Sequence, residues 1–438
     1  MKKPQKTQKP EPAGHGLVRL VTHAVQALTD VLDFEHPADA VLSRYFREHR
    51  ALGHRDRGFI AESVYGVLRR LRWLHRLAGS EATPLQLLLT WFARGEGWAM
   101  RQFDGLVTEE ECAWIETVKA ANLPEGSIAE RADLPDWLCE RLLTVFDEAG
   151  LLQLAHSLNR PAPLDLRVNI FKTDRDTVLA RLREDGIKAA PCALSPHGIR
   201  LADKSALQKH PLFIDGSFEV QDEGSQLLGF LVQPKRGEFV VDFCAGAGGK
   251  TLQLGAMMRS SGRLYALDVA EKRLTRLRPR VARAGLSNVH PMLIAHERDA
   301  RLKRLAGKAD RVLVDAPCSG LGTLRRNPDL KWRQTPAAIE EMAARQQAIL
   351  TAAAKLVHPG GRLVYATCSL LDEENDAVVD AFLAGHPGFV SLSAGTLLAQ
   401  QGIDAPGFGE RLRLSPLLHD TDGFFAAVFA RGEQSQLC

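Results

Sequence analysis

From about residue 236 to the C-terminus, short apolar segments alternate with longer amphipathic ones, and this alternation constrains the fold more than any other feature. Strands are expected at residues 239–243, 263–267, 289–294, 311–314 and 362–365. Helices are expected between them, for example at residues 271–284 and 336–356. Strands that alternate with helices form parallel sheets covered on both faces. Residues 411–414 and 424–429 are expected to add a terminal hairpin, so the predicted fold class is α/β with a Rossmann-like, doubly wound sheet.

Three further regions are expected before this sheet. Residues 1–15 are rich in Lys, Pro and Gln, which predicts a disordered tail. Residues 16–155 show no strand pattern, and apolar side chains recur at helical spacing along 59–75, so an all-α domain is expected. Residues 156–235 combine short strand patterns with a helix that Asp174 caps, which predicts a small α+β module before a domain at 236–438.

Composition limits the class of protein. The chain has 438 residues, of which 45% are hydrophobic and 25% charged, as in soluble globular proteins of two or three domains. No apolar run approaches the roughly 18 residues that cross a bilayer. Seven cysteines without a CxxC pair indicate neither a zinc site nor a disulfide scaffold, so free thiols and a cytoplasmic location are expected. A net charge of +3 neither supports nor excludes a nucleic-acid partner.

A glycine-rich turn follows the first expected strand of the sheet. Small residues there let a ligand approach the backbone beside a helix N-terminus. A dinucleotide fingerprint would need glycine at Thr251, and a phosphate-binding P-loop would need glycine at Cys244. A loop that binds S-adenosylmethionine needs only an acidic residue near the strand end and a glycine-rich turn. The expected cofactor loop comprises Cys244, Ala245, Gly246, Ala247, Gly248, Gly249 and Lys250.

Acidic residues follow the next strands. Asp268 ends the second strand, where a carboxylate accepts both hydroxyls of a ribose. NAD sites use the same device, so Asp268 indicates an adenosyl cofactor rather than S-adenosylmethionine specifically. Asp299 follows the third strand and is expected to contact the adenine amino group, and Asp315 ends the fourth strand.

Two cysteines follow neighbouring strands. Cys318 lies in Asp315-Ala316-Pro317-Cys318, and Cys368 lies in Thr367-Cys368-Ser369. Because parallel neighbouring strands end at one sheet edge, both thiols are expected beside the cofactor. A thiolate that adds to carbon 6 of cytosine makes carbon 5 nucleophilic enough to accept a methyl group. Asp315 is placed to assist at nitrogen 3, and the second thiol to assist elimination.

A basic loop lies between the two cysteines. Cations bind phosphates, and an aromatic ring stacks on an unstacked base, so the loop is a candidate RNA-binding segment. Its alternative interpretation is a solvated loop with its tryptophan packed beneath it. The candidate residues are Arg325, Arg326, Lys331, Trp332 and Arg333.

These motifs resemble the RsmB-type (NOP/Sun) family of RNA cytosine-carbon-5 methyltransferases. The resemblance covers residues 160–431 and rests on 244–251, Asp268, 315–320, 367–369 and Asp422-Gly423-Phe424-Phe425. It implies an S-adenosylmethionine-dependent enzyme that forms 5-methylcytosine in RNA, and the expected substrate is ribosomal RNA. The helical region resembles the NusB-type RNA-binding domain.

The family also implies individual roles. Cys368 is implied to be the nucleophile and Cys318 to assist product release. The chemistry of the two thiols alone does not decide which of them is the nucleophile. Contacts to the cofactor are implied for 244–250, Asp268, Asp299 and Asp315. The family's usual loop reads Cys-Ala-Ala-Pro-Gly-Gly-Lys, whereas Gly246 and Ala247 stand here in place of Ala and Pro. The alternatives are a ribosome-assembly factor without turnover and a DNA cytosine methyltransferase. We expect a monomer with no metal and no membrane partner.

Overall fold

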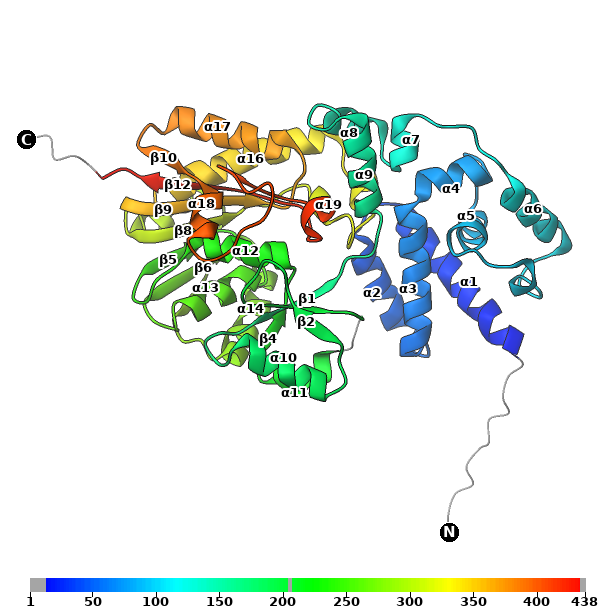
Figure 1. Ribbon diagram of the computed structural model, residues 1–438, viewed down its shortest axis with the longest axis horizontal. Helices are drawn as coiled ribbons and strands as arrows, with labels where there is room; N and C mark the ends of the chain where they lie inside the picture. The colour runs from blue at the N-terminus through cyan, green and yellow to red at the C-terminus, as the bar shows by residue number, and fades with distance from the viewer. Residues whose placement is uncertain (1–12, 204–206, 434–438) are drawn as a thin grey trace, which may run out of the picture. The chain divides into compact units, whose positions relative to one another are not determined.

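The computed structural model describes residues 13–203 and 207–433, which form two compact units (Figure 1). The first extends to Asn159 and includes the distant segment Asn327–Arg333, and the second comprises Arg160–Arg326 and Gln334 onward. The predicted tail, 1–15, lies outside the described residues except for its last three, which begin a helix. The three-part division of the chain stays a prediction, because both sheets belong to the second unit.

The first unit consists of helices. Up to Asn159 its described residues contain no strand, which agrees with the expected all-α region. Its core is formed by side chains of α1, α2, α3 and α5, among them Leu28, Ile60 and Leu88. Its helices are α1 (Ala13–Leu32), α2 (Ala38–Glu48), α3 (His54–Arg69), α4 (Leu71–Ala78), α5 (Pro84–Thr90), α6 (Glu109–Ala120), α7 (Ile128–Ala132), α8 (Asp136–Leu142) and α9 (Glu148–Leu158), with short turns η1 (Trp91–Gly95) and η2 (Met100–Gln102).

The helix expected at 59–75 is two helices rather than one. Arg70 leaves helical geometry at φ −118° and ψ 22°, so α3 ends at Arg69 and α4 begins at Leu71. The apolar spacing continues across this break, which is why the sequence pattern did not reveal it. Both helices bury the predicted stripe, including Val64, Leu68 and Leu74.

A four-stranded antiparallel sheet begins the second unit, in the order β2-β3-β1-β4. Strands β1 (Leu164–Val168) and β3 (Gly198–Leu201) occupy the predicted positions, and Asp174 caps α10 (Arg175–Glu184) as expected. The pattern missed β2 (Ala189–Pro191) and β4 (Phe218–Val220), since three-residue strands carry too few residues to show alternation. The module also contains η3 (Leu207–Lys209) and α11 (Pro211–Ile214).

The large sheet has the order β10-β12-β9-β8-β5-β6-β7, with β11 paired to β12. Strands β5 to β9 are mutually parallel, and β12 is antiparallel to β9, so the Rossmann-like prediction is confirmed. The expected terminal hairpin is β11 with β12, and β10 was not predicted. The strands are β5 (Phe239–Asp242), β6 (Arg263–Asp268), β7 (Val289–Leu293), β8 (Ala309–Asp315), β9 (Val357–Thr367), β10 (Phe389–Leu392), β11 (Leu412–Leu414) and β12 (Phe424–Arg431).

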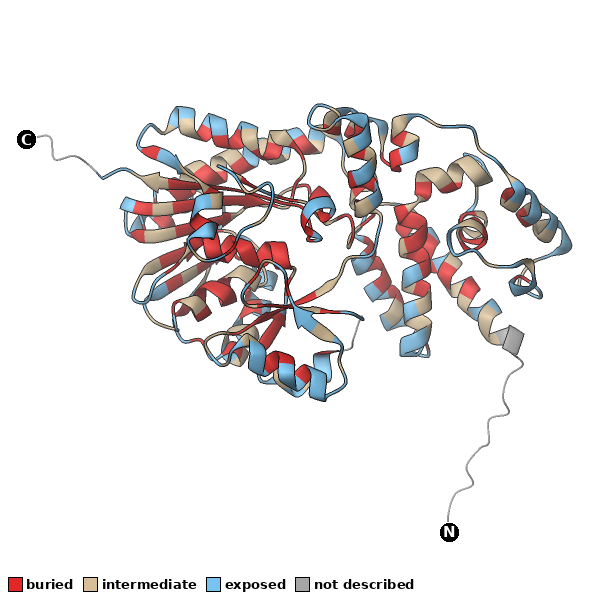
Figure 2. Cartoon of the chain, viewed as in Figure 1, coloured by how far each residue is buried: buried red, intermediate tan, exposed pale blue. Residues whose placement is uncertain are grey.

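Helices cover both faces of this sheet (Figure 1). Neighbouring residues of one strand point to opposite faces, so Val240 packs in the core beneath α12 to α14, whereas Val241 packs in the core beneath α16 and α17. Figure 2 shows the central strands almost entirely buried, as expected for a parallel sheet. The helices are α12 (Glu223–Val232), α13 (Gly249–Met257), α14 (Glu271–Ala284), α16 (Pro336–Ala354), α17 (Asp376–Gly385), α18 (Ala394–Ala399) and α19 (Pro416–His419), with turns η4 (Ala300–Arg304), η5 (Leu321–Thr323) and η6 (Asp372–Glu374).

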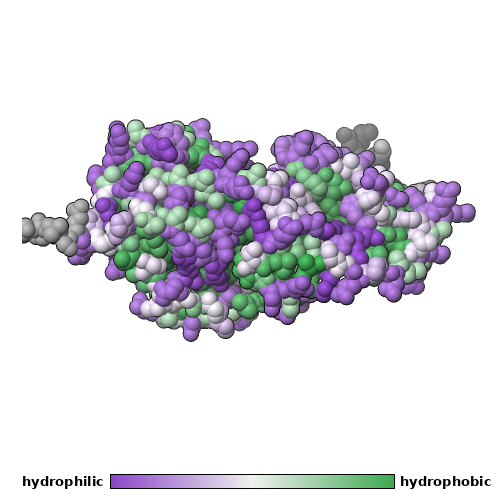
Figure 3. Space-filling model, turned by 90° about the horizontal axis from the view of Figure 1, so that it is seen from above, coloured by the Kyte–Doolittle hydropathy of each residue, from purple (hydrophilic) through white to green (hydrophobic). Residues whose placement is uncertain are grey.

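The surface carries hydrophilic residues interspersed with smaller apolar patches on the face that Figure 3 shows. Across the described ranges, no helix combines the length and apolar character that a bilayer crossing requires.

Candidate active site

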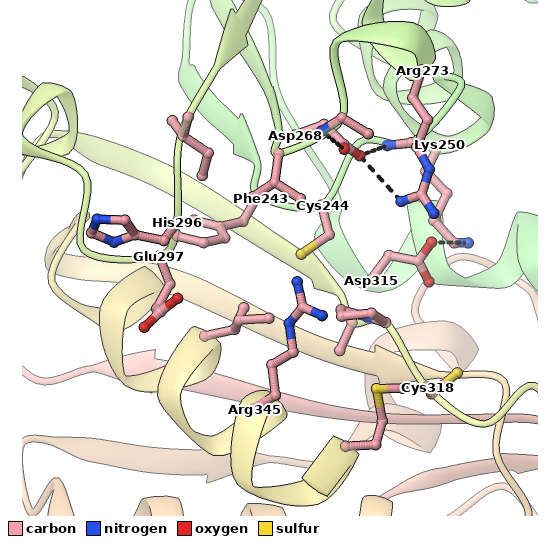
Figure 4. A pocket seen from close by; sticks show the side chains of 18 of the residues that line it. Phe243, Cys244, Lys250, Asp268, Arg273, His296, Glu297, Asp315, Cys318 and Arg345 are labelled. Atoms are coloured by element: carbon pink, nitrogen blue, oxygen red, sulfur yellow. Dashed lines mark hydrogen bonds and ion pairs between the residues drawn. The ribbon is translucent and has the colours of Figure 1, made fainter. Parts of the chain in front are cut away.

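A pocket of about 770 Å³ lies at the carboxyl ends of the parallel strands in the second unit (Figure 4). Strand β5 is flanked by β6 on one side and β8 on the other, so the strand order reverses here. Ligands of open α/β sheets bind at such a switch point. Residues that follow β5, β6, β7, β8 and β9 all contribute to the lining, including Gly246, Asp268, Asp315, Cys318 and Cys368.

The glycine-rich turn forms one wall of the pocket. Gly246 and Gly248 have positive φ angles of 57° and 90°, a conformation that glycine adopts without strain. A side chain at Gly248 would also collide with Leu277, because its Cβ would lie 2.1 Å from Leu277 Cδ1. At Gly246 a Cβ would meet no atom within 4 Å, so the backbone there faces open space. The turn therefore keeps its backbone accessible from the pocket.

Asp268 holds this turn to the end of β6. Its Oδ2 accepts the N–H of Gly246 at 2.8 Å, its Oδ1 accepts the N–H of Ala270 at 2.7 Å, and Arg273 lies 3.7 Å from Oδ2. Each carboxylate oxygen retains acceptor capacity, which suits the two hydroxyls of a ribose. The acceptor oxygens of Asp268 and the open glycine-rich turn fit an adenosyl cofactor.

Lys250 and Asp315 form an ion pair at the pocket wall, with 2.7 Å between Nζ and Oδ2. Burial alone would lower the pKa of Lys250, but the Asp315 carboxylate raises it above its usual value. The pair therefore keeps a cation beside the two cysteines. Sequence reasoning assigned Lys250 only to the cofactor loop and gave no sign of this pairing.

Asp242 lies directly beneath the turn and is completely buried. Its Oδ2 accepts the hydroxyl of Thr251 at 2.6 Å, and within the described part of the chain Oδ1 has no hydrogen-bond partner. Burial raises the pKa of Asp242 to about 7, an effect that nearby Asp315 and Asp268 reinforce and Thr251 opposes. This carboxyl was not predicted as a site residue.

The two predicted cysteines meet in the pocket. Cys318 Sγ lies 3.3 Å from Cys368 Sγ, and the backbone N–H of Cys368 donates to Cys318 Sγ at 3.2 Å. They come together because β8 and β9 are parallel neighbours, with Asp315 opposite Ala366 in register. The hydrogen bond with Cys368 and burial raise the pKa of Cys318 well above its usual value. Cys318 is therefore held as a neutral thiol that can donate to its neighbour.

Several other pocket residues were missed by sequence analysis. His296 and Glu297 follow β7, and Arg345 projects from α16 (Figure 4). Lone residues of these types in loops and helices carry no motif, so no pattern identified them. Of the predicted loop, Cys244, Gly246 and Lys250 line the pocket.

Asp299 does not line the pocket. Its carboxylate caps η4 and binds its own neighbours, with Oδ2 2.7 Å from the N–H of Ala295 and 2.6 Å from Arg301. The side-chain hydrogen bond from Arg301 lowers the pKa of Asp299. The predicted adenine contact has no support from this geometry, and Glu297 lies at the pocket wall instead.

Two of the predicted RNA-binding cations are engaged within the second unit. Arg325 is buried, pairs with Asp420 at 2.9 Å and donates to the carbonyl of Pro161. Arg326 bridges two carboxylates, those of Asp222 at 2.9 Å and Asp422 at 2.6 Å.

The other three candidates belong to the helical unit. Lys331 is buried and donates to the carbonyl of Arg69 and to Asn159, and burial lowers its pKa to about 8. Trp332 packs against the helical core and donates through Nε1 to the carbonyl of Leu68 at 2.9 Å. Arg333 donates to the carbonyl of Phe34. Their RNA contacts stay a prediction. The structure places them in a packed segment that includes α15 (Leu330–Arg333), and the packing of Trp332 agrees with the alternative interpretation.

The strand order and the glycine-rich first turn place the second unit in the class of Rossmann-like methyltransferases. Residues 229–430 match the model of the 16S rRNA methyltransferase RsmB/F family, and residues 134–208 match its ferredoxin-like domain. The chain belongs to the family of ribosomal RNA small subunit methyltransferase B. The methyl donor that this family implies is S-adenosylmethionine.

Two relatives match along almost their whole length. A probable ribosomal RNA small subunit methyltransferase B from Synechocystis is 32% identical, with 91% of this chain and 96% of the relative covered. The Sodalis glossinidius enzyme of the same name is 31% identical, with coverages of 94% and 98%. Among solved structures, PH0851 has a TM-score of 0.76 at 26% identity, covering 96% and 100% of the two chains. A methyltransferase homologue from Pyrococcus horikoshii has a TM-score of 0.60 at 26% identity, covering 70% and 100%.

Proposed function

We propose that this enzyme forms 5-methylcytosine in ribosomal RNA through a covalent adduct between Cys368 and the target base. The single observation that carries the proposal is the pair of thiols 3.3 Å apart at the wall of the pocket. A single cysteine at this position could be explained as a small apolar residue that packs in the core. Two thiols after adjacent strands, both lining one pocket beside the Lys250 cation, suit a reaction that needs a nucleophile and a proton-transfer partner.

The proposed chemistry begins with the base. The Cys368 thiolate adds to carbon 6, the carbon 5–carbon 6 double bond opens, and its electrons make carbon 5 nucleophilic. When bound, S-adenosylmethionine supplies the electrophilic methyl group that carbon 5 takes. Loss of the carbon-5 proton then re-forms the double bond, and the Cys368 thiolate leaves carbon 6. The atoms balance with one methyl group gained and one proton lost by the base.

Cys318 supports the proton transfers in this proposal. As a neutral thiol 3.3 Å from Cys368, it donates a hydrogen bond to the thiolate before attack. During elimination the carbon-5 proton passes to water, and the Cys318 thiol donates a hydrogen bond to the Cys368 sulfur as that sulfur leaves carbon 6 as a thiolate. Cys318 takes the hydrogen-bond donor role in this proposal because its surroundings keep it protonated, and this agrees with the order that the family resemblance implies.

Lys250 and Asp315 are proposed to stabilise the adduct. Addition of a thiolate places negative charge on the ring, and a fixed cation in a buried site offsets such charge without reorganisation. Lys250 supplies that cation, and Asp315 holds it in place through the 2.7 Å ion pair. The assistance at nitrogen 3 that the sequence predicts for Asp315 is in this proposal given through Lys250.

Cofactor binding is proposed for the turn from Cys244 to Lys250 and for Asp268. The accessible backbone at Gly246 would hold the cofactor at the turn, and Asp268 would accept hydrogen bonds from its ribose hydroxyls. Asp299 and the five basic-loop residues are not part of this proposal, because their charged or polar groups are bound to protein partners.

Bisulfite sequencing of total RNA tests the proposal. In a strain that lacks the gene, one cytosine of the small-subunit ribosomal RNA should become fully convertible. Wild-type protein should restore its protection, and the Cys368→Ala variant should not. If every cytosine keeps its protection in the deletion strain, or if Cys368→Ala restores it fully, the proposal is wrong.

A further inference from the structure

A buried glutamate behind the pocket connects the two cysteine loops. Glu374 is on η6, has no exposed surface and does not line the pocket. Its Oε1 accepts the backbone N–H of Ser319 at 2.8 Å, and its Oε2 accepts the hydroxyls of both Ser319 and Ser369. Each serine directly follows one of the cysteines, so a single carboxylate binds both loops.

The connection extends through Gln346 of α16. Gln346 Nε2 donates to Glu374 Oε1 and to the carbonyl of Pro317, both at 2.9 Å. Tyr365, near the end of β9, donates to the backbone carbonyl of Glu374 at 2.6 Å. The residues before and after Cys318, and the residue after Cys368, are thereby tied to one side chain.

Among the described residues Glu374 forms no ion pair with a cation. Its carboxylate instead accepts from the Ser319 N–H, from the hydroxyls of Ser319 and Ser369, and from Gln346 Nε2. An apolar side chain of similar size would leave these four buried donors without an acceptor. The contacts of Glu374 therefore serve the two loops that carry the thiols.

We propose that Glu374 is a positioning residue that sets the separation of the Cys318 and Cys368 thiols. It touches neither substrate nor cofactor and acts only through Ser319 and Ser369. The inference rests on the proposed function, because the separation matters only if both thiols take part in the reaction.

Two substitutions distinguish the effect of the length of the Glu374 side chain from the effect of its charge. Glu374→Gln keeps the length of the side chain and removes the charge, and the serine hydroxyls can rotate to accept from its amide. Glu374→Asp keeps the charge but is one methylene too short to reach both loops. If position is what matters, the Gln variant should perform better than the Asp variant. If charge matters, the order should reverse.

The first readout is geometric and needs no RNA. Glutathione disulfide should close a Cys318–Cys368 disulfide, with two protein thiols exchanged for two glutathione thiols, and peptide mass mapping identifies the bond. Closure should be about tenfold slower or more in Glu374→Asp and within about threefold of wild type in Glu374→Gln, since small displacements have large effects on reacting groups. Thermal unfolding confirms that each variant is folded.

The second readout is methyl transfer by the full chain. Glu374→Asp should lower kcat about a hundredfold while KM for RNA changes less than about threefold, as for a misplaced reacting group. Asp372→Asn is the matched control, because Asp372 lies on the same turn, pairs with Arg413 at 3.6 Å and should leave both readouts unchanged.

Two results would overturn the inference. One is a folded Asp variant that closes the disulfide and turns over as fast as the Gln variant or faster. The other is wild-type closure and kcat in both variants. Because disulfide closure does not depend on cytosine methylation, failure of the proposed function would leave the geometric readout intact.

Discussion

Three aspartates that end adjacent strands have three different surroundings. Asp268 binds backbone N–H groups, Asp315 binds Lys250, and Asp242 is buried with one oxygen unpartnered in the described structure. The same residue type thus serves as a turn anchor, as one half of an ion pair and as a buried acid. The sequence predicted a ribose contact for Asp268 and assistance at nitrogen 3 for Asp315, because both predictions depend on position after a strand. It did not reveal the protein partners of the three carboxyl groups.

Asp268→Ala should weaken binding of S-adenosylmethionine by roughly 10- to 100-fold, the effect of losing hydrogen bonds to a charged group. The substitution also frees the N–H groups of Gly246 and Ala270, which fix the turn. Isothermal titration calorimetry measures the Kd, with exposed Glu271→Ala as the control. An unchanged Kd would remove Asp268 from the cofactor site.

The raised pKa of Asp242 predicts that the stability of the folded protein depends on pH. Its pKa is raised to about 7 in the folded protein, whereas it is near 4 in an unfolded chain, so the folded state binds one more proton between those values. Its contribution to stability is present below about pH 4 and is lost as the pH rises toward 7.

Asp242→Asn removes this loss, so the Tm of the variant minus that of wild type should rise between pH 4.5 and pH 8. Scanning calorimetry at both pH values tests this, and exposed Asp176→Asn should show no such trend. A pH-independent difference for Asp242→Asn would mean that the carboxyl is charged throughout.

At the level of elements, the long buried strands and their helices were predictable. Helix α14 occupies 271–284 as expected, since its apolar positions repeat regularly. Strand β9 runs from Val357 to Thr367, well beyond the expected 362–365, because Pro359 and its glycine neighbours obscure the pattern. Glu374 was invisible for a related reason, because a run of Asp-Glu-Glu has the appearance of a solvated turn until the fold buries its last member.

The surroundings of segment Asn327–Arg333 were not predictable, because charge alone does not reveal burial. The sequence left RNA contact and a packed tryptophan as alternatives, and in the structure Lys331 is buried within the helical unit and Trp332 packs against that unit's core. Composition could not distinguish the two cases, since the partners are backbone carbonyls contributed from far away in the sequence.

Trp332→Ala should therefore lower the free energy of unfolding by about 2–3 kcal/mol, somewhat less than for a fully buried tryptophan. Affinity of the folded variant for RNA should change less than about twofold, whereas loss of a stacked base would cost roughly 1–3 kcal/mol. Chemical denaturation and filter binding measure the two quantities, with exposed Lys303→Ala as the control. Weaker RNA binding at unchanged stability would restore the RNA-contact interpretation.

For the whole molecule, the near balance of 56 basic and 53 acidic residues is an average over many internal pairs. Arg326, for example, is neutralised by two aspartates within the second unit. Net charge therefore says little about the RNA surface, and the salt dependence of RNA binding reports it better.

A chain that begins at Arg160 should be poorly soluble, because Trp332 would lose the apolar surroundings supplied by the helical unit. Replacing residues 327–333 with seven Gly and Ser residues in this fragment should restore a monodisperse species. Size-exclusion chromatography compares the two fragments. Equal behaviour would show that the segment is not an anchored part of the helical unit.

The central claim is that Cys368 bonds to the base and Cys318 helps to release it. Each cysteine variant is incubated with labelled RNA and S-adenosylmethionine, followed by denaturing electrophoresis. Cys318→Ala should retain a labelled protein–RNA adduct that survives denaturation, because attack proceeds and elimination is slow. Cys368→Ala should form no adduct and transfer no methyl group. An adduct in Cys368→Ala but not in Cys318→Ala would reverse the two roles, and full activity without an adduct in both variants would contradict covalent catalysis.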